Sequence, residues 1–488
     1  MTLTLNVEIC NREMKFTELI YETYRAVLKL GCQIVKAYLE AMDARLMETR
    51  DRKRYRNKGL KRTCVKTILG AIEYERRVYK DTEAESADEN LVYLLDEAYK
   101  IEKIGMYETS LCEIIANDIC TNTYRGTSEM IKEHTGIDIS AQGVWNIVQE
   151  AGEKEHGIIE RYAELAAKGA AQGKIETQLL YLENDGVFLT LQGKDRKKYG
   201  SSHEMKVGIA YDGVKYTRNE DGKITRRTLD TKVAYATMNN SKEFERKKKG
   251  LISSVYSSGD IDLIVKNGDG SSWIQKSEKI QTISVLDKFH RNKKVRESVR
   301  DAEEVKAIMT LLNNNETEAV VDFIEERLSV KTAEGADYNE LKKLSELLSY
   351  FSENQEALSN YYSRGIEIPP TRSPELHHAR LGSMESNIFT LIGNRMKHRR
   401  CCWSIAGANN LAILLCRKYA NGLDDIFMDL PELTGEEIEE DFGPILSHRD
   451  ATARVGSGYE YPYASEISSE YKGIKLIAHQ ESFGDLFF

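Results

Sequence analysis

Three carboxylates stand where a fold could bring them together. Asp269 follows the apolar run IDLIV and lies between Gly268 and Gly270, so the end of a strand turns sharply and presents one carboxylate. Asp185 lies in LLYLENDGVFLTL, and Glu385 lies in LGSMESNIFTLIGNRM. Carboxylate oxygens suit Mg²⁺ or Mn²⁺, and two such ions can activate an attacking hydroxyl and stabilise the leaving oxygen of a phosphodiester. The sequence therefore predicts two-metal phosphoryl transfer.

Each carboxylate also has an ordinary structural explanation. An Asp before a Gly is often a turn residue, which applies to Asp185 and Asp269. Glu385 could simply complement the dipole at the start of a helix. Glu183 is an alternative to Asp185 because residues two apart on a strand share a face.

Other polar and aromatic residues lie close in sequence to the three carboxylates. Asp287 and His290, in VLDKFH, follow a predicted strand and could position DNA or a metal-bound water, or be structural. Asn387 comes two residues after Glu385. Trp403 could stack on an unpaired base, although a tryptophan is more often part of a core.

The order of predicted elements explains how the carboxylates could meet. Three strand-like runs in KIETQLLYLENDGVFLTLQG, HEMKVGIAYDGVKYT and RRTLDTKVAYATMN precede a helix from about Lys242 to Tyr256. A strand from Ile261, a helix that begins near Trp273 and a strand in QTISVLDKFH follow. This β-β-β-α-β-α-β order predicts an α/β (α+β) fold with a ribonuclease-H-like core, in which the first strand lies beside the fourth and a late helix packs across them.

Helical patterns occupy much of the remaining chain. Residues 14–48 have apolar residues at three- and four-residue spacing, and 50–62 reads as an exposed basic arm, followed by two strands joined around Gly70. The predicted parts are an N-terminal helical region with a basic arm and a small β element (1–90), a helical, helix-turn-helix-like DNA-binding region (91–172), the first part of the core (173–300), an all-α insertion (301–370), the completion of the core with the Glu-bearing helix (371–422) and an acidic C-terminal tail (423–488).

The segment TSEMIKEHTGIDISAQGVWNIVQEAGE underlies the helix-turn-helix prediction. A helix from about Thr127 to His134 stops at Gly136, and Ser140 can cap a second helix. The core-facing side of the second helix is expected to be formed by Val144, Trp145, Ile147 and Val148. An ordinary helical hairpin explains the pattern equally well.

Charge is distributed unevenly along the 488 residues, whose net charge is −9. Residues 424–441 hold nine acidic side chains and no Lys or Arg, so the rest of the chain is neutral and carries dense basic runs. These runs predict contacts with DNA phosphates, although a solvated charged surface is the simpler explanation for any one of them. The candidate DNA-binding residues are Arg52, Lys53, Arg54, Arg56, Lys58, Arg62, Arg395, Lys397, Arg399 and Arg400.

Composition sets the broad class of protein. With 41% hydrophobic and 30% charged residues, the chain is expected to form two to four folding units. No stretch approaches the roughly 18 uncharged apolar residues of a membrane helix, and the first residues lack a signal-peptide layout, so a cytoplasmic protein without a membrane partner is expected. None of the eight cysteines forms a CxxC pair, which argues against structural zinc.

The chain resembles bacterial insertion-sequence transposases of the ISLre type, a group of uncharacterised transposase-like proteins distantly similar to Mutator-class DDE transposases. The motifs that carry the resemblance are YLENDGVFL, NGDGSSWI, VLDKFHR, GSMESNIFTLIGNRMKHRRCCWS, KRTCVKTILGAIEYERRVY and LVYLLDE, which cover most of the chain. The resemblance implies a DDE triad at Asp185, Asp269 and Glu385, two Mg²⁺ (or Mn²⁺) ions, and DNA cleavage and strand transfer by an oligomer bound to transposon ends. A structure-selective nuclease and a catalytically inactive DNA-binding regulator are the alternatives.

Overall fold

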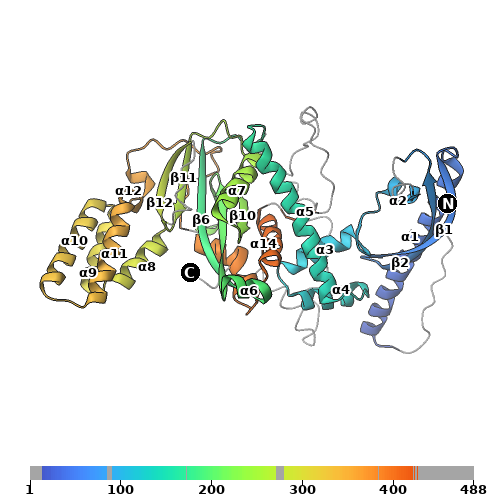
Figure 1. Ribbon diagram of the computed structural model, residues 1–488, viewed down its shortest axis with the longest axis horizontal. Coiled ribbons are helices and arrows are strands. Elements are labelled where there is room, and N and C mark those ends of the chain that lie inside the picture. The colour runs from blue at the N-terminus through green and yellow to red at the C-terminus, as the bar shows by residue number, and fades with distance from the viewer. Residues whose placement is uncertain are drawn as a thin grey trace. The chain divides into compact units, whose positions relative to one another are not determined.

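The computed structural model describes residues 14–84, 91–171, 173–270, 280–382, 384–420, 422–423 and 426 (Figure 1). The helix expected near Trp273 and the acidic segment 424–441 lie outside the described residues, apart from residue 426 of that segment.

The N-terminal region is built on one long helix and a long hairpin. Helix α1 (Phe16–Thr49) packs against strand β2 (Gly70–Asp81), which pairs antiparallel with β1 (Tyr55–Thr67). Alternate residues of β2, including Ile72 and Tyr74, are buried on the side of the helix, as a two-residue period requires. The predicted helix and the two strands joined around Gly70 are present, and most of the basic run at 50–62 is exposed as expected, but the greater part of that run is strand β1 rather than an arm.

Short elements complete this sheet and lead away from it. The sheet order is β3-β2-β1-β5-β4. The additional elements are β3 (Leu91–Val92), α2 (Leu94–Tyr99), β4 (Lys103–Ile104), β5 (Tyr107–Glu108) and α3 (Thr109–Ile119).

Two capped helices occupy the predicted helix-turn-helix segment. Helix α4 (Tyr124–Thr135) ends at Gly136, whose φ of 69° is left-handed, and the Ser140 hydroxyl accepts a hydrogen bond from the Gly143 N–H at 3.0 Å to cap α5 (Ala141–Ala167). Residues Val144, Ile147 and Val148 are buried as predicted, whereas Trp145 is 37% exposed. Helix α5 packs against α7 (Ser241–Val255) and α14 (Ile405–Ala420), so it belongs to the core of the molecule along much of its length.

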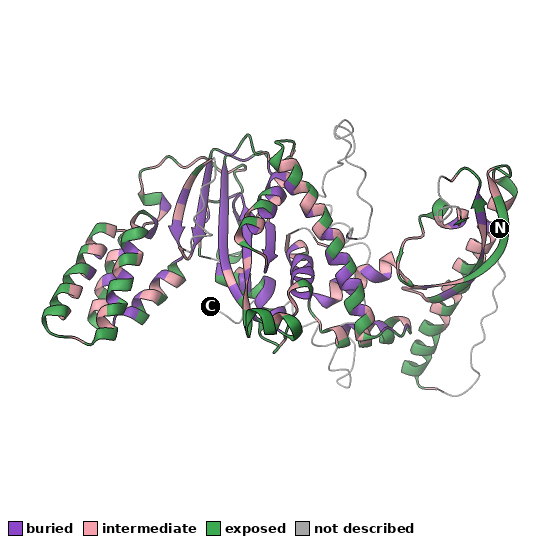
Figure 2. Cartoon of the chain, in the orientation of Figure 1, coloured by how far each residue is buried: buried purple, intermediate pink, exposed green. Residues whose placement is uncertain are grey.

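A five-stranded mixed sheet forms the centre, in the order β10-β7-β6-β11-β12. Its strands, almost entirely buried, are β6 (Leu179–Thr190), β7 (Ser202–Tyr211), β10 (Val233–Thr237), β11 (Leu263–Gly268) and β12 (Gln281–Leu286) (Figure 2). Strands β10, β7 and β6 pair antiparallel, whereas β6, β11 and β12 run parallel. The fold is thus mixed α and β.

The strand-like runs of the sequence divide more finely than expected. The second and third runs each contain two strands, and the added pair, β8 (Val214–Arg218) with β9 (Ile224–Leu229), makes a separate two-stranded sheet. A short helix α6 (Gly193–Tyr199) links β6 to β7.

Opposite faces of β6 meet different partners. Leu180 and Leu182 pack with Ile252 of α7 (Ser241–Val255), whereas Tyr181 points into the larger core that contains α14 (Ile405–Ala420). Because residues two apart share a face, Glu183 and Asp185 belong to the Tyr181 face.

A helical subdomain with its own apolar core follows β12. Its helices are α8 (Lys288–Ser298), α9 (Ala302–Asn313), α10 (Thr317–Ala333), α11 (Tyr338–Glu353) and α12 (Gln355–Leu358). The helical packing starts at Lys288 rather than at residue 301. The chain returns through a 3₁₀ turn (Tyr361–Ser363) to α13 (Met384–Ile388), which continues as a π-helix over Phe389–Lys397. None of the described helices has the length and apolarity needed to cross a membrane.

Histidine 156 on α5 should make the fold sensitive to acid. Burial, reinforced by Lys247, lowers its pKa from 6.5 to about 4, and its Nδ1 finds no hydrogen-bond partner among the described residues. As the pH falls, the imidazole of His156 therefore takes up a proton at a higher pH in the unfolded chain than in the folded chain. The free energy of unfolding decreases between pH 6.5 and pH 4 for this reason, by up to about 1.4 kcal/mol per pH unit. We expect His156→Gln to reduce the loss of thermal stability between pH 7 and pH 5. The exposed His134→Gln should leave that loss unchanged.

Candidate functional site

Asp185 is the most strongly positioned of the three predicted carboxylates. The Gly186 N–H donates to Asp185 Oδ1 at 2.7 Å, and His290 Nε2 lies 3.2 Å from Asp185 Oδ2. The hydrogen bond that His290 donates to this carboxylate raises the pKa of His290, with further contributions from the charges of Asp185, Asp287 and Asp269. The side chain of Asp185 keeps 12% of its surface exposed, so it can reach a ligand.

Asp269 is held close to Asp185 by the register of the sheet. Asn267 pairs with Glu183 in the parallel ladder, and continuing that register by two residues brings Asp269 level with Asp185. Neighbouring strands lie about 4.8 Å apart. The Tyr350 hydroxyl of the helical subdomain donates to the main-chain oxygen of Asp269 at 2.8 Å, which anchors this turn.

A buried amide connects the two sides of the site. Asn267 Nδ2 donates to Glu183 Oε2 at 3.0 Å and to Asp287 Oδ2 at 3.3 Å. Asp287 in turn caps α8, since its Oδ1 accepts from the N–H groups of Phe289 and His290. Asp287 thereby orients the helix that carries His290, which is the structural alternative considered for it.

Glu183 is fully buried, and both of its carboxylate oxygens accept hydrogen bonds. The Tyr211 hydroxyl donates to Glu183 Oε1 at 2.6 Å, while Asn267 occupies the other oxygen. A completely enclosed carboxylate with both oxygens in use is poorly placed to take a ligand. This geometry favours Asp185 over Glu183 at the first position.

The helix that carries Glu385 packs against β6, on the Tyr181 face to which Asp185 belongs. Met384 and Ile388 of this helix pack in the same core as Tyr181, while Glu385 itself is exposed. Within the described residues, the three carboxylates do not form a group that could hold one metal ion. Asn387 accepts from the Tyr419 hydroxyl at 2.9 Å, so it ties this helix to α14.

Two predicted DNA contacts are structural instead. Arg395 is only 4% exposed, and its Nε donates to the Ile119 carbonyl at 2.8 Å. Trp403 is 5% exposed, its indole N–H donates to the Met396 carbonyl at 2.9 Å, and its ring lies 5.6 Å from the guanidinium of Arg395. The predicted phosphate contact for Arg395 is therefore wrong, and Trp403 is a core residue, the alternative that the sequence favoured over base stacking. Both groups link the π-helix to its surroundings.

A substitution separates this structural role from DNA binding. We expect Arg395→Ala to destabilise the protein by about 2 kcal/mol, since it leaves the Ile119 carbonyl without its partner and a cavity beside Trp403. The neighbouring exposed Lys397→Ala should leave the melting temperature within about 1 °C. Thermal unfolding of both variants checks this, and equal melting temperatures would contradict it.

The other predicted basic residues lie at the surface, and three of them are bound to other groups of the protein. Arg54 is half-buried and bound to Asp81, with Nη2 to Oδ2 at 2.8 Å, and Arg62 pairs with Glu73. Arg399 donates to the Thr121 carbonyl at 2.6 Å. The exposed remainder of the set is Arg52, Lys53, Arg56, Lys58, Lys397 and Arg400.

Sequence reasoning missed Tyr211 and Asn267, which hold the buried network together. A signal for Asn267 exists, since it precedes Asp269 by two residues and so continues the same strand face. The signal for Tyr211 is absent from the sequence because its pairing with β6 depends on the sheet register.

The donor groups near Asp185 bear on metal binding. The described residues hold no group of three or more His, Cys, Asp or Glu close enough to bind one ion. The register of β6 and β11 brings Asp185 and Asp269 level, and their carboxylate oxygens are the donors that a hard cation with few protein ligands prefers. The donor chemistry of the two aspartates therefore fits such an ion.

Comparison with known proteins gives one consistent result. A family model described as an uncharacterised protein family, UPF0236, matches residues 9–426. Two similar proteins from Caldanaerobacter subterraneus subsp. tengcongensis are each 26% identical over 360 residues, covering 72% of this chain and 70% of the relative. One is named UPF0236 protein TTE0610/TTE0881/TTE1053/TTE2432, and the name of the other joins eleven locus labels, from TTE0033 to TTE2212.

Proposed function

The chain belongs to the uncharacterised protein family UPF0236, and because that name states no activity, we propose from the site itself that the protein is a DDE transposase. It would cut DNA at the ends of an insertion sequence and join the freed strand to target DNA. The observation that carries the proposal is the register of two parallel strands in the middle of the sheet, which brings Asp269, just past the end of β11, level with Asp185 within β6.

The topology of the sheet supports a ribonuclease-H-like core. In chain order, the five core strands lie 3-2-1-4-5, with the first three antiparallel and the last two parallel to the first. That is the arrangement expected from the β-β-β-α-β-α-β order of the sequence. Asp269 then follows the carboxyl end of β11, the edge at which ligands bind in parallel sheets, and Asp185 lies beside it in the longer strand β6.

The residues of the site have distinct roles in this proposal. Asp185 and Asp269 would hold Mg²⁺ or Mn²⁺, with Glu385 completing the set, and such ions when bound activate the attacking hydroxyl and stabilise the leaving oxygen. His290 positions the carboxylate of Asp185 through the contact at 3.2 Å. The Asn267 amide donates hydrogen bonds to Glu183 and Asp287, and thereby ties β11 to β6 on one side and to the end of β12 on the other.

The occurrence of similar proteins at several loci of one genome supports the proposal of a mobile element. Names that join several locus labels of one genome mean that matching proteins are encoded at several loci, as expected for a gene that copies itself to new sites. Two ends must be paired during transposition, so we propose that the protein acts as an oligomer on DNA.

The test is an incubation of the full chain with Mg²⁺, a labelled duplex that carries one terminal repeat of the source element, and target plasmid. Cleavage at the repeat end followed by a joined product is the expected result. Cleavage without any joined product would instead identify a nuclease. Binding without either reaction, in Mg²⁺ and in Mn²⁺, would identify an inactive DNA-binding relic or regulator.

A further inference from the structure

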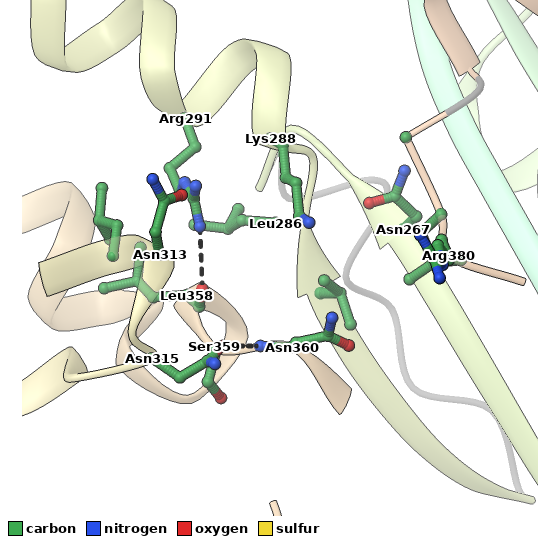
Figure 3. A pocket seen from close by; sticks show the side chains of 14 residues that line it. Asn267, Leu286, Lys288, Arg291, Asn313, Asn315, Leu358, Ser359, Asn360 and Arg380 are labelled. Atoms are coloured by element: carbon green, nitrogen blue, oxygen red, sulfur yellow. Dashed lines mark hydrogen bonds between the residues drawn. The ribbon is translucent and has the colours of Figure 1, made fainter. Parts of the chain in front are cut away.

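A small open cavity of about 80 Å³ lies where the helical subdomain meets the ends of β11 and β12 (Figure 3). That volume is below the roughly 300–1,000 Å³ of sites that enclose a whole small ligand, so the cavity suits a single charged group. Asn267, the residue that bonds Glu183 and Asp287, is part of its wall. The cavity therefore adjoins the carboxylate site without including any of the carboxylates.

The lining of the cavity is cationic. Lys288 and Arg291 reach it from helix α8, and Arg380 lies beside Asn267 (Figure 3). Of the described residues that line it, none is Asp or Glu, while Asn313 and Asn360 add polar groups. Three formal positive charges thus face one space.

Arg291 is a buried charge with neutral partners. It is 3% exposed, its Nε donates to Asn292 Oδ1 at 3.1 Å and its Nη1 donates to the Leu358 carbonyl at 3.2 Å. Burial lowers its pKa, and the nearby charge of Asp287, which is engaged at the cap of α8, only partly offsets that cost. A buried guanidinium whose bonded partners are uncharged is stabilised when an anion enters.

We propose that this cavity binds a phosphate of the nucleic-acid strand that passes the carboxylates, a few nucleotides from the point of cleavage. Guanidinium and ammonium groups match phosphate oxygens in charge and hydrogen-bonding capacity. The identity of the ligand as a strand rests on the proposed function. The anion-binding property rests on the lining alone.

The test uses the exposed cations, because their removal leaves the packing of Arg291 intact. Binding of a fluorescent single-stranded 20-nucleotide DNA to the full chain is measured by anisotropy, in EDTA, over a range of salt concentrations. The variants are Lys288→Ala, Arg380→Ala and the double variant, and the control is Lys306→Ala, whose side chain is 77% exposed on α9.

We expect the double variant to bind at least about tenfold more weakly, with a slope of log K against log salt smaller by roughly 1.4 for two lost contacts to a single strand. The control should stay within about twofold of the wild type. An unchanged affinity and slope in the double variant would overturn the proposal.

A second arm separates a strand from a free phosphate compound. Adenosine monophosphate is titrated against each variant. Loss of nucleotide binding with retained oligonucleotide binding overturns the assignment to a strand. If the wild type never cleaves DNA yet the double variant binds the oligonucleotide more weakly, the cavity is supported and the transposase proposal fails.

Discussion

Replacing Asp185 by asparagine should abolish strand cleavage and strand transfer, with a fall in rate of roughly 10³-fold or more, equivalent to about 4 kcal/mol of transition-state stabilisation. Asparagine keeps the size of the side chain and can still accept from the Gly186 N–H. The substitution removes the negative charge of Asp185 beside His290, and metal binding at the site depends on that charge. Single-turnover cleavage of the labelled repeat end measures the effect.

The matched control for Asp185→Asn is Asp260→Asn. Asp260 is exposed just before the start of β11, at the end of that strand opposite to Asp269, and so carries a carboxylate away from the network. Its substitution should leave the cleavage rate within about twofold. Unchanged melting of Asp185→Asn would show that lost activity does not come from unfolding. Wild-type cleavage by Asp185→Asn would refute its assignment, and the same measurement on Glu183→Gln then decides between the two acidic residues.

Replacing Gly250 by alanine should destabilise the protein strongly. A Cβ at Gly250 of α7 would lie 2.5 Å from the Cα and N atoms of Ala163 on α5. Both neighbours are backbone atoms, so the helices must separate, at a net cost of about 2 kcal/mol even after the better helix propensity of alanine. We expect the melting temperature to fall by roughly 2–4 °C.

Gly157→Ala is the control for this prediction. Gly157 lies on α5 as well, but an added Cβ there meets nothing within 4 Å. The substitution should stabilise the helix by about 0.5–1 kcal/mol, since alanine loses less backbone entropy than glycine. Thermal unfolding that ranks the two variants in the opposite order would show that the α5 and α7 helices do not approach so closely.

Local patterns explain which elements were predictable. The helix from Ser241 to Val255 and the strand from Leu263 to Gly268 were expected within a few residues because each has a clear apolar period and flanking caps or glycines. Ser140 and Gly136 likewise marked two helix ends by their side-chain and backbone chemistry. Such signals act over three or four residues, so they are legible in the sequence.

Burial was less predictable than element type. The basic run at 395–400 gave no sign that Arg395 would be enclosed while Lys397 stays in solvent. The reason is the π-helix over Phe389–Lys397, which changes the angular spacing of side chains and turns Arg395 towards Ile119. The exposed arm at 50–62 became a strand because its partner, β2, is defined by pairing across a turn.

The sequence by itself determined the identities of the acidic residues and the order of strands and helices around them, since periodicity, capping and turn chemistry are local. Only the tertiary structure decided that Asn267 joins Glu183 to Asp287, that His290 meets Asp185, and that Glu385 stays exposed on its helix. Those outcomes depend on the register between β6 and β11 and on the packing of helices from distant parts of the chain. Contacts between residues 20 to 105 positions apart are selected by the burial of the whole core, which no short segment encodes.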